Sequence, residues 1–140
     1  MYEIEAKDIK KSFGNLEVLK SISLQVNKGE VVAILGSSGS GKSTFLRSLI
    51  DLETVDGGSI SIAGENLCKD GVYVSKKEKA KALSKAGMVF QHFNLFPHMS
   101  IRKNLMCAPL LNKQGTKEEI SKLAESTLAK VGLLDKIDAM

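Results

Sequence analysis

The sequence predicts an α/β fold in which antiparallel strands lead into a buried strand, a glycine-rich loop and a helix. Apolar and polar residues alternate through residues 2–26, which is typical of strands with one buried face. Residues 31–35 are all apolar, as in a strand that is covered on both faces. After a loop rich in glycine and serine, apolar residues recur at helical spacing from Phe45 to Ile50.

The loop at residues 36–44 matches the phosphate-binding pattern G-x-x-x-x-G-K-[ST] and directly follows the apolar run, as that motif requires. Its glycines allow positive φ angles and close approach of the backbone, so that successive N–H groups can hold phosphate oxygens. The helix that begins near Lys42 adds the positive end of its dipole. The expected nucleotide-binding residues are Gly36, Ser37, Ser38, Gly39, Ser40, Gly41, Lys42, Ser43 and Thr44.

Three side chains of this loop have distinct expected roles. Lys42 supplies an ammonium for the β and γ phosphates, and the Ser43 hydroxyl is a hard oxygen ligand for a phosphate-bound Mg²⁺. Thr44 is placed to reach the α phosphate. The alternative is a Gly/Ser-rich turn that spells the motif by chance, which average composition allows in roughly one chain in a few hundred. The preceding apolar strand makes chance a weaker explanation.

Bulk properties indicate an ordinary globular domain. The chain has 140 residues, of which 43% are hydrophobic and 26% charged, with a net charge of +4. The lysines between Lys76 and Lys81 are interpreted as a solvated helix face, with nucleic-acid or lipid contact as the less favoured alternative. Cys68 and Cys107 lack metal-site spacing and are expected to be reduced thiols. No signal peptide or membrane span is evident, so a membrane role would require a partner.

The remaining elements follow from periodicity and turn residues. Helical periodicity after Thr116, which forms a capping-box pattern with Glu119, predicts a helix that Gly132 ends. The other expected elements are strands at 59–63 and 87–90, a surface loop at 69–75, a helix at 76–85, an irregular stretch at 91–100 and a helix from Ile101 to before Pro109.

The phosphate-binding loop and the segment Met-Val-Phe-Gln-His-Phe-Asn-Leu-Phe-Pro-His-Met-Ser at 88–100 together resemble the ATP-binding subunit of ABC transporters. The similarity is greatest to bacterial importers of polar amino acids, and it also includes residues 17–24. It implies a P-loop NTPase of the ABC ATPase type. Residues 1–100 would form the nucleotide-binding core with its antiparallel β subdomain, and residues 101–140 the beginning of an α-helical subdomain.

The resemblance assigns roles to further residues. Gln91 matches the glutamine of the family's Q-loop, which with Ser43 would position Mg²⁺ and the attacking water; otherwise Gln91 is a polar residue that ends a strand. Phe13 takes the place of the adenine-stacking aromatic, more often tyrosine, and a buried core phenylalanine is the alternative. Phe93, Leu95 and Phe96 would meet the transmembrane permease subunits, although core packing of at least one is also expected.

The implied assembly is a homodimer of full-length ATPase subunits that binds ATP and Mg²⁺ and no nucleic acid. It would lie peripherally on the cytoplasmic face of the inner membrane. His92 and His98 are interpreted as ordinary loop histidines, because the family's switch histidine lies much further along.

Several parts of the family's chemistry do not occur within these residues. The sequence contains no Leu-Ser-Gly-Gly-Gln signature and no apolar strand ending in Asp-Glu. We therefore expect an amino-terminal fragment of a larger ATPase, which binds nucleotide without turnover. The alternatives are an ABC subunit of the methionine or lipoprotein type and a noncatalytic nucleotide-binding module. A small-molecule kinase is disfavoured because Arg47 and Arg102 are the only arginines.

Overall fold

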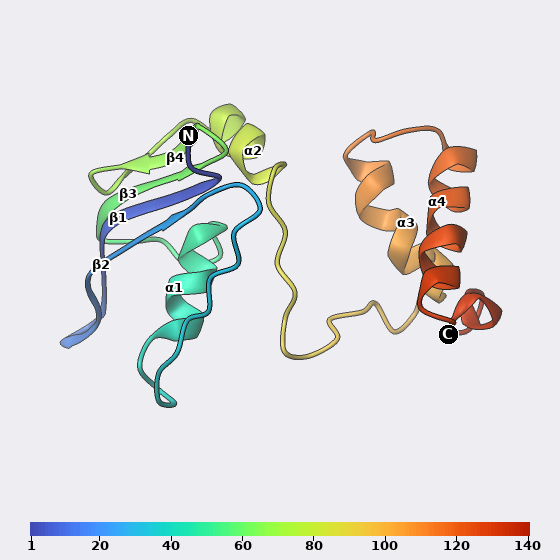
Figure 1. The fold of residues 1–140 in the computed structure, drawn as a ribbon, viewed down its shortest axis with the longest axis horizontal. Coiled ribbons are helices and arrows are strands. Elements are labelled where there is room, and N and C mark those ends of the chain that lie inside the picture. Colours follow the sequence, from blue (N-terminus) through green and yellow to red (C-terminus); the bar gives the residue numbers. More distant parts are fainter. The chain divides into compact units, whose positions relative to one another are not determined.

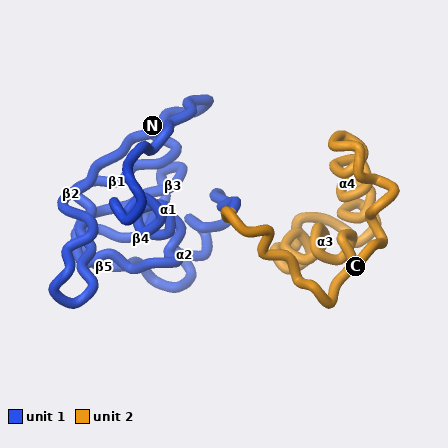
Figure 2. The backbone as a smooth tube through the Cα atoms, turned by 90° about the horizontal axis from the view of Figure 1, so that it is seen from below, with its two compact units in different colours: residues 1–89 blue, residues 90–140 orange.

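The computed structural model describes residues 1–140, and they form two compact units (Figures 1 and 2). The first unit spans Met1–Val89 and the second Phe90–Met140. The division at residue 100 that the family resemblance implies stays a prediction. Each unit is described separately below.

The first unit contains an antiparallel five-stranded sheet. Its strand order is β2-β1-β3-β4-β5, and every neighbouring pair is antiparallel. The alternating pattern of the amino-terminal residues therefore predicted its first two strands correctly. The strands are β1 (Ile4–Phe13), β2 (Leu16–Val26), β3 (Gly57–Ile62), β4 (Glu65–Lys69) and β5 (Val72–Tyr73).

Two helices belong to the sheet unit, α1 (Lys42–Leu49) and α2 (Lys76–Leu83). Helix α1 lies along one face of the sheet, as Figure 1 shows, where Phe45 and Leu49 join the buried core formed by the strands. Helix α2 begins with a capping box at Ser75. Burial of the apolar face of α1 fixes the helix whose first turn follows the phosphate-binding loop.

Two predicted strands do not form. The run at 31–35 has no strand assignment, and the side chains of Val31 and Leu35 are 95% and 91% exposed. Residues 87–90 likewise form no strand, and Val89 is 96% exposed. The physical reason is that a strand requires a hydrogen-bonded neighbour, and no segment of the described chain pairs with either run.

The predicted surface loop at 69–75 also needs correction, because it contains β5. The Tyr73 hydroxyl accepts a hydrogen bond of 2.9 Å from the backbone N–H of Val55. This long-range contact ties the short strand to the segment before β3 and could not be derived from local sequence pattern.

The second unit consists of α3 (Ile101–Leu111), α4 (Lys117–Lys130) and the 3₁₀ turn η1 (Leu134–Lys136). The capping box of Thr116 and Glu119 forms as predicted, and Gly132 follows α4 with φ 73°. Helix α3 is longer than predicted and includes Pro109, since a proline in the last turn removes only one N–H donor. None of the helices in the structure has the length and apolar character needed to cross a bilayer.

Candidate functional site

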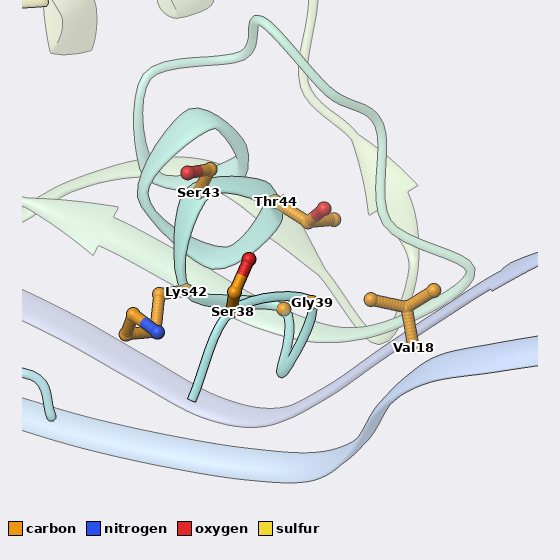
Figure 3. A pocket seen from close by; sticks show the side chains of 7 residues that line it. Val18, Ser38, Gly39, Lys42, Ser43 and Thr44 are labelled. Atoms are coloured by element: carbon orange, nitrogen blue, oxygen red, sulfur yellow. The ribbon is translucent and has the colours of Figure 1, made fainter. Parts of the chain in front are cut away.

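A hollow of about 550 Å³ opens above the phosphate-binding loop (Figure 3). Most of its lining comes from the loop and the first turn of α1, which follow each other in sequence. Val18 is the exception, because it comes from β2. The lining residues are Val18, Ser38, Gly39, Gly41, Lys42, Ser43 and Thr44.

The first turn of α1 has features that favour binding of an anion. Its N-cap is Gly41, which offers no side-chain cap, and the turn contains no acidic residue. The first N–H groups of the helix therefore keep no side-chain acceptor, and the dipole is not compensated by a carboxylate. Gly39 and Gly41 have φ angles of 79° and 94°, which turn the backbone ahead of the helix. An anion in the hollow would meet both features.

The Lys42 ammonium folds back over the loop. Its Nζ donates hydrogen bonds to the backbone carbonyl of Gly36, to the carbonyl of Ser37 at 2.7 Å and to the Ser40 hydroxyl at 3.3 Å. These partners are neutral, and they engage all three donors of the ammonium. A phosphate would offer the same group charged acceptors, which make stronger hydrogen bonds.

Two glycines of the motif have close neighbours where a side chain would begin. Gly36 does not adopt a positive φ angle, but an added Cβ would lie 2.7 Å from the Ser40 hydroxyl. At Gly41, where φ is positive, a Cβ would also lie 3.0 Å from a methyl group of Val18. The loop is therefore packed against β2 at Gly41, whereas the close atom at Gly36 is the end of the Ser40 side chain, which can rotate away.

Val18 is the lining residue that sequence reasoning missed. It is half-buried on β2, where it packs against the core and borders the hollow. Alternation along the strand identifies its apolar character but cannot show that the loop reaches it. Only the tertiary fold brings the two segments together.

Phe13 lies at the end of β1, opposite Leu16 in the hairpin. Its ring is 46% exposed, and the Lys11 ammonium lies 5.1 Å from its centroid. This exposure argues against the alternative of a buried core phenylalanine. Phe13 does not line the hollow itself, so its stacking role stays a prediction.

The other predicted site residues belong to the second unit. Gln91 is exposed there, and its role beside Mg²⁺ stays a prediction. Phe93, Leu95 and Phe96 are 94%, 59% and 49% exposed. We call residues 93–96, which carry these three apolar side chains, the aromatic segment.

Of the residues predicted to bind Mg²⁺, Ser43 borders the hollow. No group of three or more His, Cys, Asp or Glu side chains is arranged to hold a metal ion. The exposed Ser43 hydroxyl in the first turn of α1 is compatible with a Mg²⁺ that phosphate oxygens also bind.

Comparison with known proteins identifies similar sequences and folds. A model of the ABC transporter family matches residues 19–140. The arginine transport ATP-binding protein ArtM of Bacillus subtilis is 47% identical over 133 residues, covering 95% of this chain and 53% of its own. The glutamate transport ATP-binding protein GluA of Corynebacterium glutamicum is 42% identical over 135 residues, covering 96% of this chain and 54% of its own.

A solved structure supports the same fold. The protein cbiO1 from Clostridium perfringens, described as part of the ABC transporter complex cbiONQ, matches with a TM-score of 0.77 at 25% identity. The match covers 99% of this chain and 53% of the other. The chain spans about half the length of the curated relatives it matches.

Proposed function

The chain belongs to the ABC transporter family, and from this premise we propose that its loop at residues 36–44 binds the phosphates of ATP. The observation that carries the proposal is the uncompensated first turn of α1 beside the Lys42 ammonium. Backbone N–H groups, helix dipole and ammonium converge on one hollow, and all three favour an anion. Val18 supplies an apolar wall at its edge.

The proposal is tested by titrating the chain with Mg-ATP, Mg-ADP and AMP in a calorimeter. Affinity should decrease in that order, because each phosphate removed takes away charged acceptors for Lys42 and for the N–H groups of the loop. Equal affinity for all three nucleotides would contradict a phosphate-binding role. Absence of binding in a sample whose helices and sheet are intact by circular dichroism would also contradict it.

We assign Ser43 and Gln91 to a Mg²⁺ ion that arrives with the nucleotide. A serine hydroxyl and an amide oxygen are both hard ligands that this ion accepts. Gln91 would also orient water for attack on the terminal phosphate. Within the proposed parent, residues 1–100 form the nucleotide-binding core and residues 101–140 begin the helical subdomain.

For these residues alone we expect binding without turnover. Phosphoryl transfer depends on positioning and charge stabilisation, and a general base typically contributes about 10² to 10⁴ in rate. No apolar strand ending in Asp-Glu occurs within the 140 residues to supply that base. Mg-dependent release of phosphate that disappears in Lys42→Ala would overturn this expectation.

The whole protein, in this proposal, energises import of a polar amino acid. Support comes from relatives whose names specify arginine or glutamate transport. Two such subunits would form a homodimer, held peripherally on the cytoplasmic face of the membrane by permease subunits. Uptake of labelled arginine, glutamate and methionine in cells with and without the gene distinguishes this substrate class from the methionine type. If cells without the gene take up all three amino acids as well as cells with it, a noncatalytic module is favoured.

The permease contact is assigned to the aromatic segment. Phe93 and Leu95 together present two large apolar side chains on an irregular stretch, and both are more than half exposed. Exposed apolar groups of this size are typical of an interaction surface. Replacing Phe93 by serine should weaken binding to membrane subunits and leave ATP affinity unchanged.

A further inference from the structure

Asn104, in the first turn of α3, holds the end of the aromatic segment through both the oxygen and the nitrogen of its side-chain amide. Its Oδ1 accepts a hydrogen bond of 2.8 Å from the backbone N–H of Phe96. Its Nδ2 donates to the backbone carbonyl of Phe96 at 3.2 Å, and to those of Met99 and Ser100 at 3.2 and 3.1 Å. One side chain thus binds both polar groups of the same residue in the segment.

The arrangement admits only one orientation of the amide. The Phe96 N–H requires an acceptor, and the three backbone carbonyls require a donor. Rotating the amide by half a turn would place like groups against each other at every contact. Asparagine is therefore specified by the site, since aspartate lacks the donor and alanine lacks both functions.

The held residue begins a turn. The backbone N–H of Met99 donates to the carbonyl of Phe96 at 3.1 Å, and Pro97 follows Phe96 at the position that such turns favour. The rings of Phe96 and His98 meet edge to face with centroids 5.9 Å apart. The turn and the Asn104 contacts together fix the backbone from which Phe96 projects.

The helix that carries Asn104 is itself anchored. The N–H groups of Ile101 and Arg102 donate to the carbonyls of Ala139 and Ile137 at 2.9 and 2.7 Å. The Arg102 guanidinium bonds Glu125 on α4 at 2.8 Å and Asp138 at 2.9 Å. Asn104 therefore ties the aromatic segment to a fixed part of the second unit.

We propose that Asn104 is a positioning residue that fixes the shape in which the aromatic segment is presented to a membrane subunit. The proposal rests on the proposed docking role of that segment. Exposed apolar side chains on an irregular backbone would otherwise sample many conformations, and ordering them on binding would reduce affinity. Asn104 supplies that order before the partner arrives.

Hydrogen exchange at the Phe96 amide tests the positioning directly, using the chain with Asn104→Ala, Asn104→Asp and the control Lys103→Ala. Lys103 lies in the same turn with an exposed side chain. Exchange at Phe96 should be about two- to tenfold faster in Asn104→Ala, as expected for one lost hydrogen bond. Asn104→Asp keeps the acceptor, so it should exchange more slowly than Asn104→Ala, and Lys103→Ala should match the original.

Two results of the exchange measurement would overturn the proposal. The first is unchanged exchange at Phe96 in Asn104→Ala. The second is an equal acceleration at the buried Met106 in the middle of α3, because the asparagine would then stabilise the helix as a whole. Acceleration confined to Phe96 and its turn supports positioning.

Docking is measured with the membrane subunits of a bacterial arginine importer held in lipid nanodiscs and the full-length protein. Weaker binding by both Phe93→Ser and Asn104→Ala, with ATP affinity unchanged in each, supports the proposal. If Phe93→Ser weakens binding and Asn104→Ala does not, the positioning role is wrong. If neither variant alters binding while Phe96 exchange responds to Asn104→Ala, the proposed docking function fails instead.

Discussion

The Lys42 ammonium donates a 2.7 Å hydrogen bond to the backbone carbonyl of Ser37, within the loop that it is expected to serve. The lysine is thus held by neutral acceptors of its own loop. A bound phosphate would replace these contacts or add charged ones. The free energy that Lys42 contributes to binding is therefore the difference between its contacts with and without phosphate. The same contacts keep the ammonium at the hollow before nucleotide arrives.

Replacing Lys42 by alanine should lower Mg-ATP affinity about tenfold to hundredfold, since a hydrogen bond to a charged group contributes about 1.5–3 kcal/mol. Calorimetric titration measures the change. Lys28→Ala is the matched control, because Lys28 is an exposed lysine in the turn before the apolar run. Equal losses in both variants would indicate a general charge effect and contradict a specific contact.

Replacing Phe13 by alanine should weaken ATP binding about fivefold or more and leave phosphate-only ligands unaffected. The reason is that base stacking on an aromatic ring contributes about 1–3 kcal/mol. Phe13→Tyr should retain affinity, because the ring face is kept. Leu16→Ala serves as the control, since Leu16 lies opposite Phe13 in the same hairpin and is 66% exposed. Pyrophosphate that loses affinity with Phe13→Ala would argue against stacking.

Gly41→Ala should weaken nucleotide binding, although alanine is a better helix former than glycine. The Cβ of an alanine there would lie 3.0 Å from Val18, and its backbone would have to keep a φ angle of 94°, so the loop must shift. Gly87→Ala is the control, because a Cβ at Gly87 meets nothing within 4 Å. Thermal unfolding and ATP titration of both variants check the prediction, and identical behaviour would refute it.

Stability of the first unit should fall as pH rises from about 10 to about 12. Burial raises the pKa of Tyr73 to about 12, so the folded chain retains the phenol proton where the unfolded chain loses it. This contribution is present below the unfolded pKa and disappears as pH passes through the folded one. The Lys79 Nζ lies 4.8 Å from the Tyr73 ring centroid.

Tyr73→Phe tests this assignment. It removes the phenol and should flatten the Tyr73 part of the pH dependence, while it lowers stability at neutral pH because the Val55 N–H loses its acceptor. Urea unfolding at several pH values measures both effects. A pH profile unchanged by Tyr73→Phe would contradict the assignment to Tyr73.

Local sequence predicted the elements whose stabilising contacts are near in the chain. The Thr116 and Glu119 capping box depends on residues within one turn, and it formed. The helix beginning at Lys42 also formed, and its apolar face joins the buried core. The strands at 31–35 and 87–90 failed because apolar composition indicates burial but does not provide a pairing partner. The role of Val18 was missed for a related reason, since it depends on packing between β2 and the loop.

The sequence by itself determined the phosphate-binding motif, its family and the helix that follows, because these depend on residue identity at fixed spacing. Only the tertiary structure decided that Val18 borders the hollow and that Asn104 holds Phe96 by two hydrogen bonds and the following turn by two more. These properties depend on distances between segments. Such distances arise from burial and strand pairing across the chain, which no local pattern encodes.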